Sequence, residues 1–187
     1  AYAMQGNNES FNVIAQIREF LDKNEYSKDY YSVQTDLTEA FAYTISGNIN
    51  KSNDILNSVV KEYGEKTMET DLLSDWNLIN IINRVFLDQI YDLKSDLFEL
   101  ATFTNNINEH FTKNIVKLIL AYVLKAEGNI EKAKEIIDEQ TTYFAKEKVS
   151  IGFLLSWLML VQLTIESGDD EKALTTATKS LEIAQSP

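Results

Sequence analysis

The sequence predicts an all-α fold, a right-handed solenoid of about four and a half helical hairpins with about nine helices. Apolar residues recur at three- and four-residue spacing through almost the whole chain, and alternating strand patterns are absent. The only proline is the last residue, Pro187, and there are only 6 glycines, so few residues interrupt a helix. A short turn pattern, clearest in AEGNIEKAKEII, recurs at steps near 40 residues.

The recurring turn contains a glycine between two amphipathic segments. Its copies are centred on Gly6, Gly47, Gly128 and Gly168, which are 41, 81 and 40 residues apart. The middle step is close to two periods, so we predict that one copy has lost its glycine. We expect that copy to turn at Tyr91 and Asp92, with Leu93 in the place of Ile49 and Ile130.

Each turn has a physical rationale. Glycine adopts the left-handed conformation that commonly ends a helix, and the asparagine or aspartate after it can cap the next helix. The position five residues after the glycine is often small, which would let the two helices of a hairpin pack closely; the examples are Ser52, Ala133 and Ala173.

The expected helices follow from these turns and from the apolar spacing. The first follows Gly6, and residues 1–5 read as the end of an earlier helix. Three segments each show a clear apolar face. Leu56 and Val59 belong to the first face, Ile137 and Phe144 to the second, and Leu181 to the third. The predicted helices cover residues 10–22, 26–46, 50–63, 71–91, 93–108, 111–127, 130–146, 149–167 and 170–185.

Composition limits the possible functions. The net charge of −12 opposes binding to nucleic acid and to anionic membranes. The chain has no cysteine and no basic segment leading into an apolar signal core, so we predict a cytoplasmic protein. The most apolar run, from Ile151 to Ile165, is shorter than the ~20 residues of a membrane helix.

The hairpins resemble degenerate tetratricopeptide repeats, with a unit longer than the usual 34 residues. A second resemblance rests on helix order. The stretches LLSDWNLINIINRVFLDQIYDLKSDLFELATFTNNI, KNIVKLILAYVLKAEGNIEKAKEIIDE and FLLSWLMLVQLTIESGDDEKALTTATKSLEIA resemble the C-terminal regulatory domain of Rgg/GadR/MutR transcriptional regulators, over residues 10–185.

That resemblance implies one TPR-like domain over residues 1–187, with a helix-turn-helix DNA-binding domain upstream of this chain. It also implies a homodimer that senses a short peptide on its concave face, as in quorum sensing. The first alternative is a generic TPR-like scaffold for a protein partner, with no link to DNA. The second, which the sequence favours least, is a repeat-domain enzyme or phosphatase regulator.

A polar stripe is the main candidate for the peptide site. Asn77, Asn80, Arg84 and Asp88 share one face of an otherwise apolar helix. Asparagine side chains can bind the backbone of an extended peptide, and arginine can bind a carboxylate. The alternative is a solvated face with an ion pair between Arg84 and Asp88.

Two further sets of residues complete the prediction. Tyr122 and Lys125 are additional candidates for peptide contact. The helix from residue 149 is apolar almost all round, so a partner is needed to cover it. We therefore predict a dimer interface at Phe153, Trp157, Leu158 and Val161.

Enzyme signatures are missing from the sequence. His110 is the only histidine, so no multi-histidine metal site can form, and no glycine-rich phosphate loop is present. We predict a protein that is not an enzyme and that uses no cofactor or metal.

Overall fold

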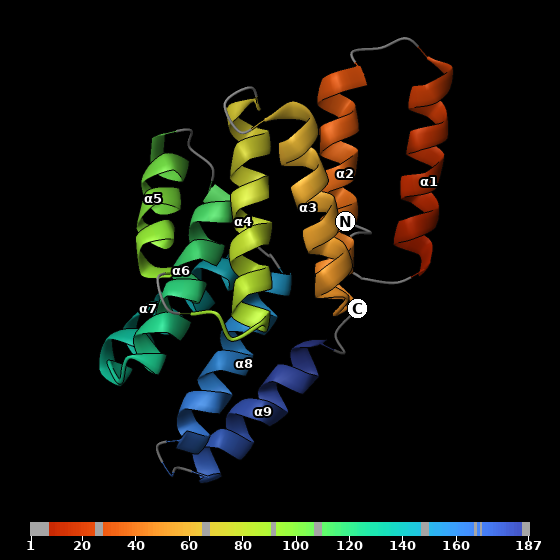
Figure 1. The fold of residues 1–187 in the computed structure, drawn as a ribbon. Helices are drawn as coiled ribbons and strands as arrows, with labels where there is room; N and C mark the ends of the chain where they lie inside the picture. The colour runs from red at the N-terminus through yellow and green to blue at the C-terminus, as the bar shows by residue number, and fades with distance from the viewer. Residues whose placement is uncertain are drawn as a thin grey trace. The chain divides into compact units, whose positions relative to one another are not determined.

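The computed structural model describes residues 8–24, 28–64, 68–90, 93–106, 110–146, 150–166, 168 and 170–184. Within these ranges there are nine helices and no strand, so the all-α prediction is confirmed (Figure 1). The helices are α1 (Asn8–Lys23), α2 (Lys28–Ile45), α3 (Ile49–Tyr63), α4 (Thr70–Phe86), α5 (Leu93–Asn106), α6 (His110–Ala126), α7 (Ile130–Lys146), α8 (Ser150–Glu166) and α9 (Asp170–Ala184).

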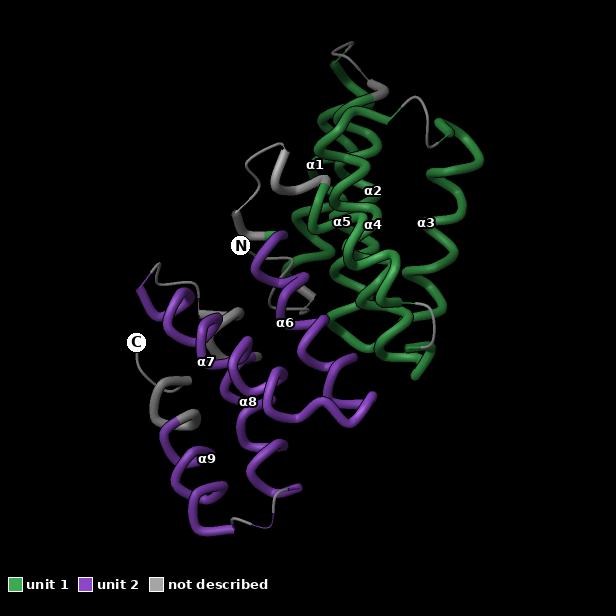
Figure 2. The backbone as a smooth tube through the Cα atoms, turned by 90° about the vertical axis from the view of Figure 1, so that its left-hand side faces the viewer, with its two compact units in different colours: residues 1–112 green, residues 113–187 purple. Residues whose placement is uncertain are grey.

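Two compact units divide the chain, residues 1–112 and residues 113–187 (Figure 2). Unit 1 holds α1 to α5, and unit 2 holds α7 to α9 and all but the first residues of α6. One TPR-like domain over 1–187 therefore stays a prediction.

Helix α2 is central to unit 1, since it packs against α1, α3 and α4. Helix α4 also packs against α3 and α5. The core joins three helices, because apolar side chains from each face a common interior. Its buried members are Val33, Leu37, Ala40, Leu56, Val59, Leu72 and Ile79.

A buried polar cluster lies where α2, α3 and α4 meet. Thr44, Ser52 and Asn83 are all fully buried. The Thr44 hydroxyl donates to Asn83 Oδ1 over 2.7 Å, and Asn83 Nδ2 donates to Ser52 Oγ and to Asn53 Oδ1, each over 2.8 Å. These bonds offset the cost of burying polar groups and fix how the three helices meet.

Unit 2 is organised around α8, which packs against α7 and α9. The buried core of this unit consists of Ala121 and Leu124 of α6, Ala133 and Ile137 of α7, and Leu163 of α8. The described part of the apolar helix α8 is therefore covered only in part by α6, α7 and α9.

The turn after α4 corrects one prediction. Helix α4 ends at Phe86 instead of residue 91, and Asp88 follows it with a left-handed φ of 57°. Tyr91 and Asp92, where the turn was predicted, lie outside the described residues. Gly47, Asp88, Gly128 and Gly168 are 41, 40 and 40 residues apart, so Asp88 takes the glycine position.

The position of Leu93 relative to the turn also differs from the prediction. Leu93 lies five residues after Asp88, which is the position of Ser52 and Ala133 after their glycines, and not the position of Ile49 or Ile130. Ser52, Ala133 and Leu93 are all fully buried. Of the turns at Gly47, Asp88 and Gly128, only the turn at Asp88 thus has a large side chain at the close-packing position.

Candidate functional site

The predicted polar stripe on α4 is partly used by the helix itself. Asn77 Nδ2 donates to the carbonyl oxygen of Leu73 over 2.9 Å, one turn earlier in α4. Asn80 is half-buried. Of the two stripe carboxamides, that of Asn77 is therefore already bonded within its own helix.

The other two stripe residues have different surroundings. The Arg84 guanidinium donates to the carboxylate of Asp96, so it joins α4 to α5. Asp88 lies beyond the end of α4, in the left-handed turn, and is exposed. The structure thus separates Asp88 from the helical stripe and gives Arg84 a partner other than Asp88.

Tyr122 and Lys125 lie in unit 2, on α6. Lys125 Nζ is 2.7 Å from the carboxylate of Glu166 in α8, and 5.9 Å from the centre of the Tyr122 ring. The Lys125 side chain is only 13% exposed. Lys125 forms an ion pair with Glu166, and this ion pair joins α6 and α8.

The predicted dimer residues lie on α8. Trp157 and Val161 are half-buried, while the side chains of Phe153 and Leu158 lie outside the described residues. Ile165, at the end of the same helix, is 55% exposed. An apolar surface therefore remains on α8 despite its neighbours.

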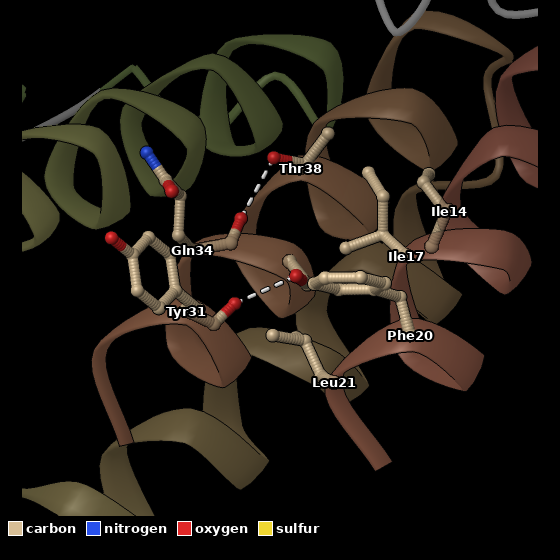
Figure 3. A pocket seen from close by; sticks show the side chains of 8 residues that line it. Ile14, Ile17, Phe20, Leu21, Tyr31, Gln34 and Thr38 are labelled. Atoms are coloured by element: carbon tan, nitrogen blue, oxygen red, sulfur yellow. Dashed lines mark hydrogen bonds between the residues drawn. The ribbon is translucent and has the colours of Figure 1, made fainter. Parts of the chain in front are cut away.

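A groove lies between α1 and α2 of unit 1 (Figure 3). Its volume is about 440 Å³. Helix α1 supplies the first wall and α2 supplies the second. The lining residues are Ile14, Ile17, Phe20, Leu21, Tyr31, Gln34, Thr35 and Thr38.

The groove is apolar although three of its residues carry hydroxyl groups. The Thr35 hydroxyl donates to the carbonyl oxygen of Tyr31, and the Thr38 hydroxyl donates to that of Gln34 (Figure 3). Both threonine hydroxyls thus donate to backbone carbonyl oxygens of α2. Phe20 is 58% exposed and Tyr31 is 47% exposed, so large ring surfaces are open to solvent.

An ion-pair cluster fixes the two walls of this groove. Arg18 of α1 contacts Asp36 Oδ1 over 2.7 Å and also contacts Glu39, both on α2. The centres of the Phe11 and Tyr43 rings are 4.6 Å apart, and this contact adds a second link between the two helices. These contacts hold α1 against α2 and so set the spacing of the two walls.

Sequence reasoning missed this groove. The usable signal was the width of the apolar surface on α1, which runs from Phe11 and Ile14 round to Phe20. In unit 1, α1 packs chiefly against α2. A single neighbouring helix cannot cover so wide an apolar face, so part of it stays open.

The described residues also limit other kinds of site. They contain no group of three or more histidine, cysteine, aspartate or glutamate side chains able to hold a metal ion. No helix in the described ranges is long and apolar enough to span a bilayer. No protein-family model matches the chain, and neither a curated protein nor a solved structure matches it.

Proposed function

We propose that this protein is a peptide-binding domain built as a right-handed solenoid of TPR-like helical hairpins. The observation that carries the proposal is the apolar groove between α1 and α2. Its volume of about 440 Å³ falls in the range of ligand sites, about 300 to 1,000 Å³. The regular spacing of Gly47, Asp88, Gly128 and Gly168 supports the repeat architecture.

The occupant we propose is a short segment with at least one large apolar side chain and a positive net charge. Ile17, Phe20 and Tyr31 would bury the apolar side chain. Gln34 carries a carboxamide, which can both donate to and accept from a peptide backbone. The net charge of −12 would attract a basic segment and speed its association.

A selection experiment tests the proposal. The whole chain is immobilised and a random heptapeptide display library is enriched on it. The best peptide is then titrated into isotope-labelled protein and the NMR shifts are mapped. We expect the largest shifts at Ile14, Ile17, Phe20 and Leu21. Shifts centred on Asn80 would move the site to α4, and failure to enrich any peptide would count against peptide binding.

The biological setting we propose is the sensory and dimerising domain of an Rgg-like transcriptional regulator. Helix order supports it: a tryptophan-bearing α4 is followed by the hairpins of α6 to α9. A peptide that prefers one arrangement of the helices would shift the population of dimer states. The coding sequence upstream of Ala1 tests this setting, because the proposal requires a basic helix-turn-helix there.

A generic interaction scaffold is the second candidate. It shares the groove, but it lacks the DNA-binding domain and does not require a dimer. Light scattering separates the two further, since the regulator requires a dimer through α8, where Ile165 remains 55% exposed. A monomer at high concentration would favour the scaffold.

A further inference from the structure

A second hollow lies in unit 1, among the start of α2, the end of α3 and the residues that lead into α4. Its volume is about 290 Å³. Figure 1 shows α2, α3 and α4 side by side in this unit. The residues around it are Tyr30, Val33, Glu62, Tyr63, Met68, Glu69 and Leu72.

The inner part of this pocket is apolar. Val33 and Leu72 are buried members of the unit 1 core. Tyr30, Tyr63 and Met68 are partly buried and pack against that core. The lining therefore combines two aromatic rings, a thioether and two buried aliphatic side chains, which suits a hydrocarbon chain.

The rim of the pocket is acidic. Glu62 and Glu69 are exposed, and Asp71 accepts a hydrogen bond from the Tyr30 hydroxyl over 2.5 Å. Among the described residues, no lysine or arginine forms an ion pair with Glu62, Glu69 or Asp71. The negative charge at the rim is thus not neutralised by the described part of the chain.

The helix does not use the Glu69 carboxylate either. Glu69 is the residue before α4, but its side chain makes no capping hydrogen bond. The hydrogen bond to Asp71 raises the pKa of the Tyr30 phenol further above physiological pH, from 10.0 to about 12, so this phenol is neutral there. The Tyr30 ring is therefore a neutral aromatic group, as a cation–π contact requires.

We propose that this pocket binds an organic cation, an ammonium or guanidinium group on an aliphatic stem, such as a lysine or arginine side chain. The stem would lie against Val33, Met68 and Leu72, and the cation would reach Glu62 and Glu69. A metal ion fits less well, since the described residues hold no cluster of three or more potential ligands. The proposal does not depend on the groove between α1 and α2.

The test compares two probes that differ in charge. Nα-acetyl-lysine methylamide and its norleucine analogue are titrated into the whole chain, and the Met68 methyl signal is followed by NMR. We expect the lysine probe to give a saturable shift and the norleucine probe to give none at the same concentration. Equal shifts with both probes, or no saturable shift with the lysine probe, would overturn the proposal.

Variants that remove charge test whether the cation binds at Glu62 and Glu69. Glu62→Gln with Glu69→Gln should weaken binding of the lysine probe about tenfold. The matched control, Glu135→Gln with Asp138→Asn on the exposed face of α7, removes the same charge and should retain affinity within about twofold. Equal losses in the two double variants would mean non-specific attraction and would refute the site.

A third titration separates two sources of the same chemistry. Putrescine is a free diamine without a peptide backbone. Tighter binding of the lysine probe would assign the pocket to a side chain of a polypeptide, and tighter binding of putrescine would assign it to a small amine. Either result supports a cation site, provided that the variant pair behaves as stated.

Discussion

Asp88 adopts the same backbone arrangement as Gly47. The N–H of Gly47 donates to the Thr44 carbonyl oxygen over 3.0 Å, and the N–H of Asp88 donates to that of Val85 over 3.1 Å. The next N–H in each turn, from Asn48 or Gln89, donates five residues back, over 2.9 and 2.8 Å. Asp88 therefore ends α4 in the way that Gly47 ends α2, and φ is positive at both residues.

Replacing Asp88 with glycine should stabilise the protein. A left-handed conformation costs a residue with a Cβ roughly 1 kcal/mol, and a carboxylate near a helix C-terminus is unfavourable. We expect Asp88→Gly to raise the free energy of unfolding by about 1 kcal/mol, measured by urea denaturation. The reverse case serves as control. Gly128→Ala should cost about 1 kcal/mol from backbone strain alone, since an added Cβ would meet nothing within 4 Å. A neutral or destabilising Asp88→Gly would contradict the assignment.

Removing Asn83 should destabilise unit 1 strongly. Asn83 is fully buried and bonds to Thr44, Ser52 and Asn53. We expect Asn83→Ala to cost about 3 kcal/mol, because buried hydroxyls lose their partner. The control is Asn80→Ala, on the same helix and half-buried, which should cost less than about 1 kcal/mol. Similar losses for both would show that the cluster contributes little.

Gln140 offers a stabilising change. Its side chain is fully buried in α7, and neither its Nε2 nor its Oε1 has a hydrogen-bond partner among the described residues. We expect Gln140→Met, which keeps the unbranched shape, to raise the free energy of unfolding by about 1 to 2 kcal/mol. Gln162→Met, at an exposed position of α8, should change it by less than about 0.5 kcal/mol. A destabilising Gln140→Met would show that the carboxamide has a role in the folded chain.

The phenol of Tyr30 should titrate late. Its hydrogen bond to the Asp71 carboxylate, then its burial and the charges of Asp71, Glu69 and Asp75, raise its pKa from 10.0 to about 12. The folded value exceeds the unfolded one, so this contribution to stability is complete below pH 10 and is lost as pH rises through about 12. Asp71→Asn should bring the pKa back toward 10.0, measured by ultraviolet difference titration against Tyr30→Phe. An unchanged Tyr30 titration would rule out Asp71 as the main cause.

The sequence was sufficient for the helices because helical spacing and glycine turns are local signals. Gly47 and Gly128 are visible in the sequence, and the helices on either side of each were placed within two or three residues. Asp88 gave no such signal, because aspartate occurs at many positions and only the backbone angle shows its role. The prediction therefore carried α4 five residues too far.

The site needed information that the sequence does not carry locally. Arg84 pairs with Asp96 instead of Asp88, and this pairing depends on how α5 packs against α4. Likewise, Lys125 reaches Glu166 on another helix. The groove depends on which face of α1 meets α2, so Phe20 could be recognised as apolar but not as exposed.

The direct test of peptide binding compares two phenylalanines of equal exposure. Phe20 in the groove is 58% exposed, and Phe98 on α5, outside the groove, is 56% exposed. The dissociation constant of the best selected peptide is measured by fluorescence polarisation for wild type, Phe20→Ser and Phe98→Ser. The groove predicts that Phe20→Ser weakens binding about tenfold or more and that Phe98→Ser stays within about twofold of wild type. Unchanged affinity in Phe20→Ser would contradict the groove as the peptide site.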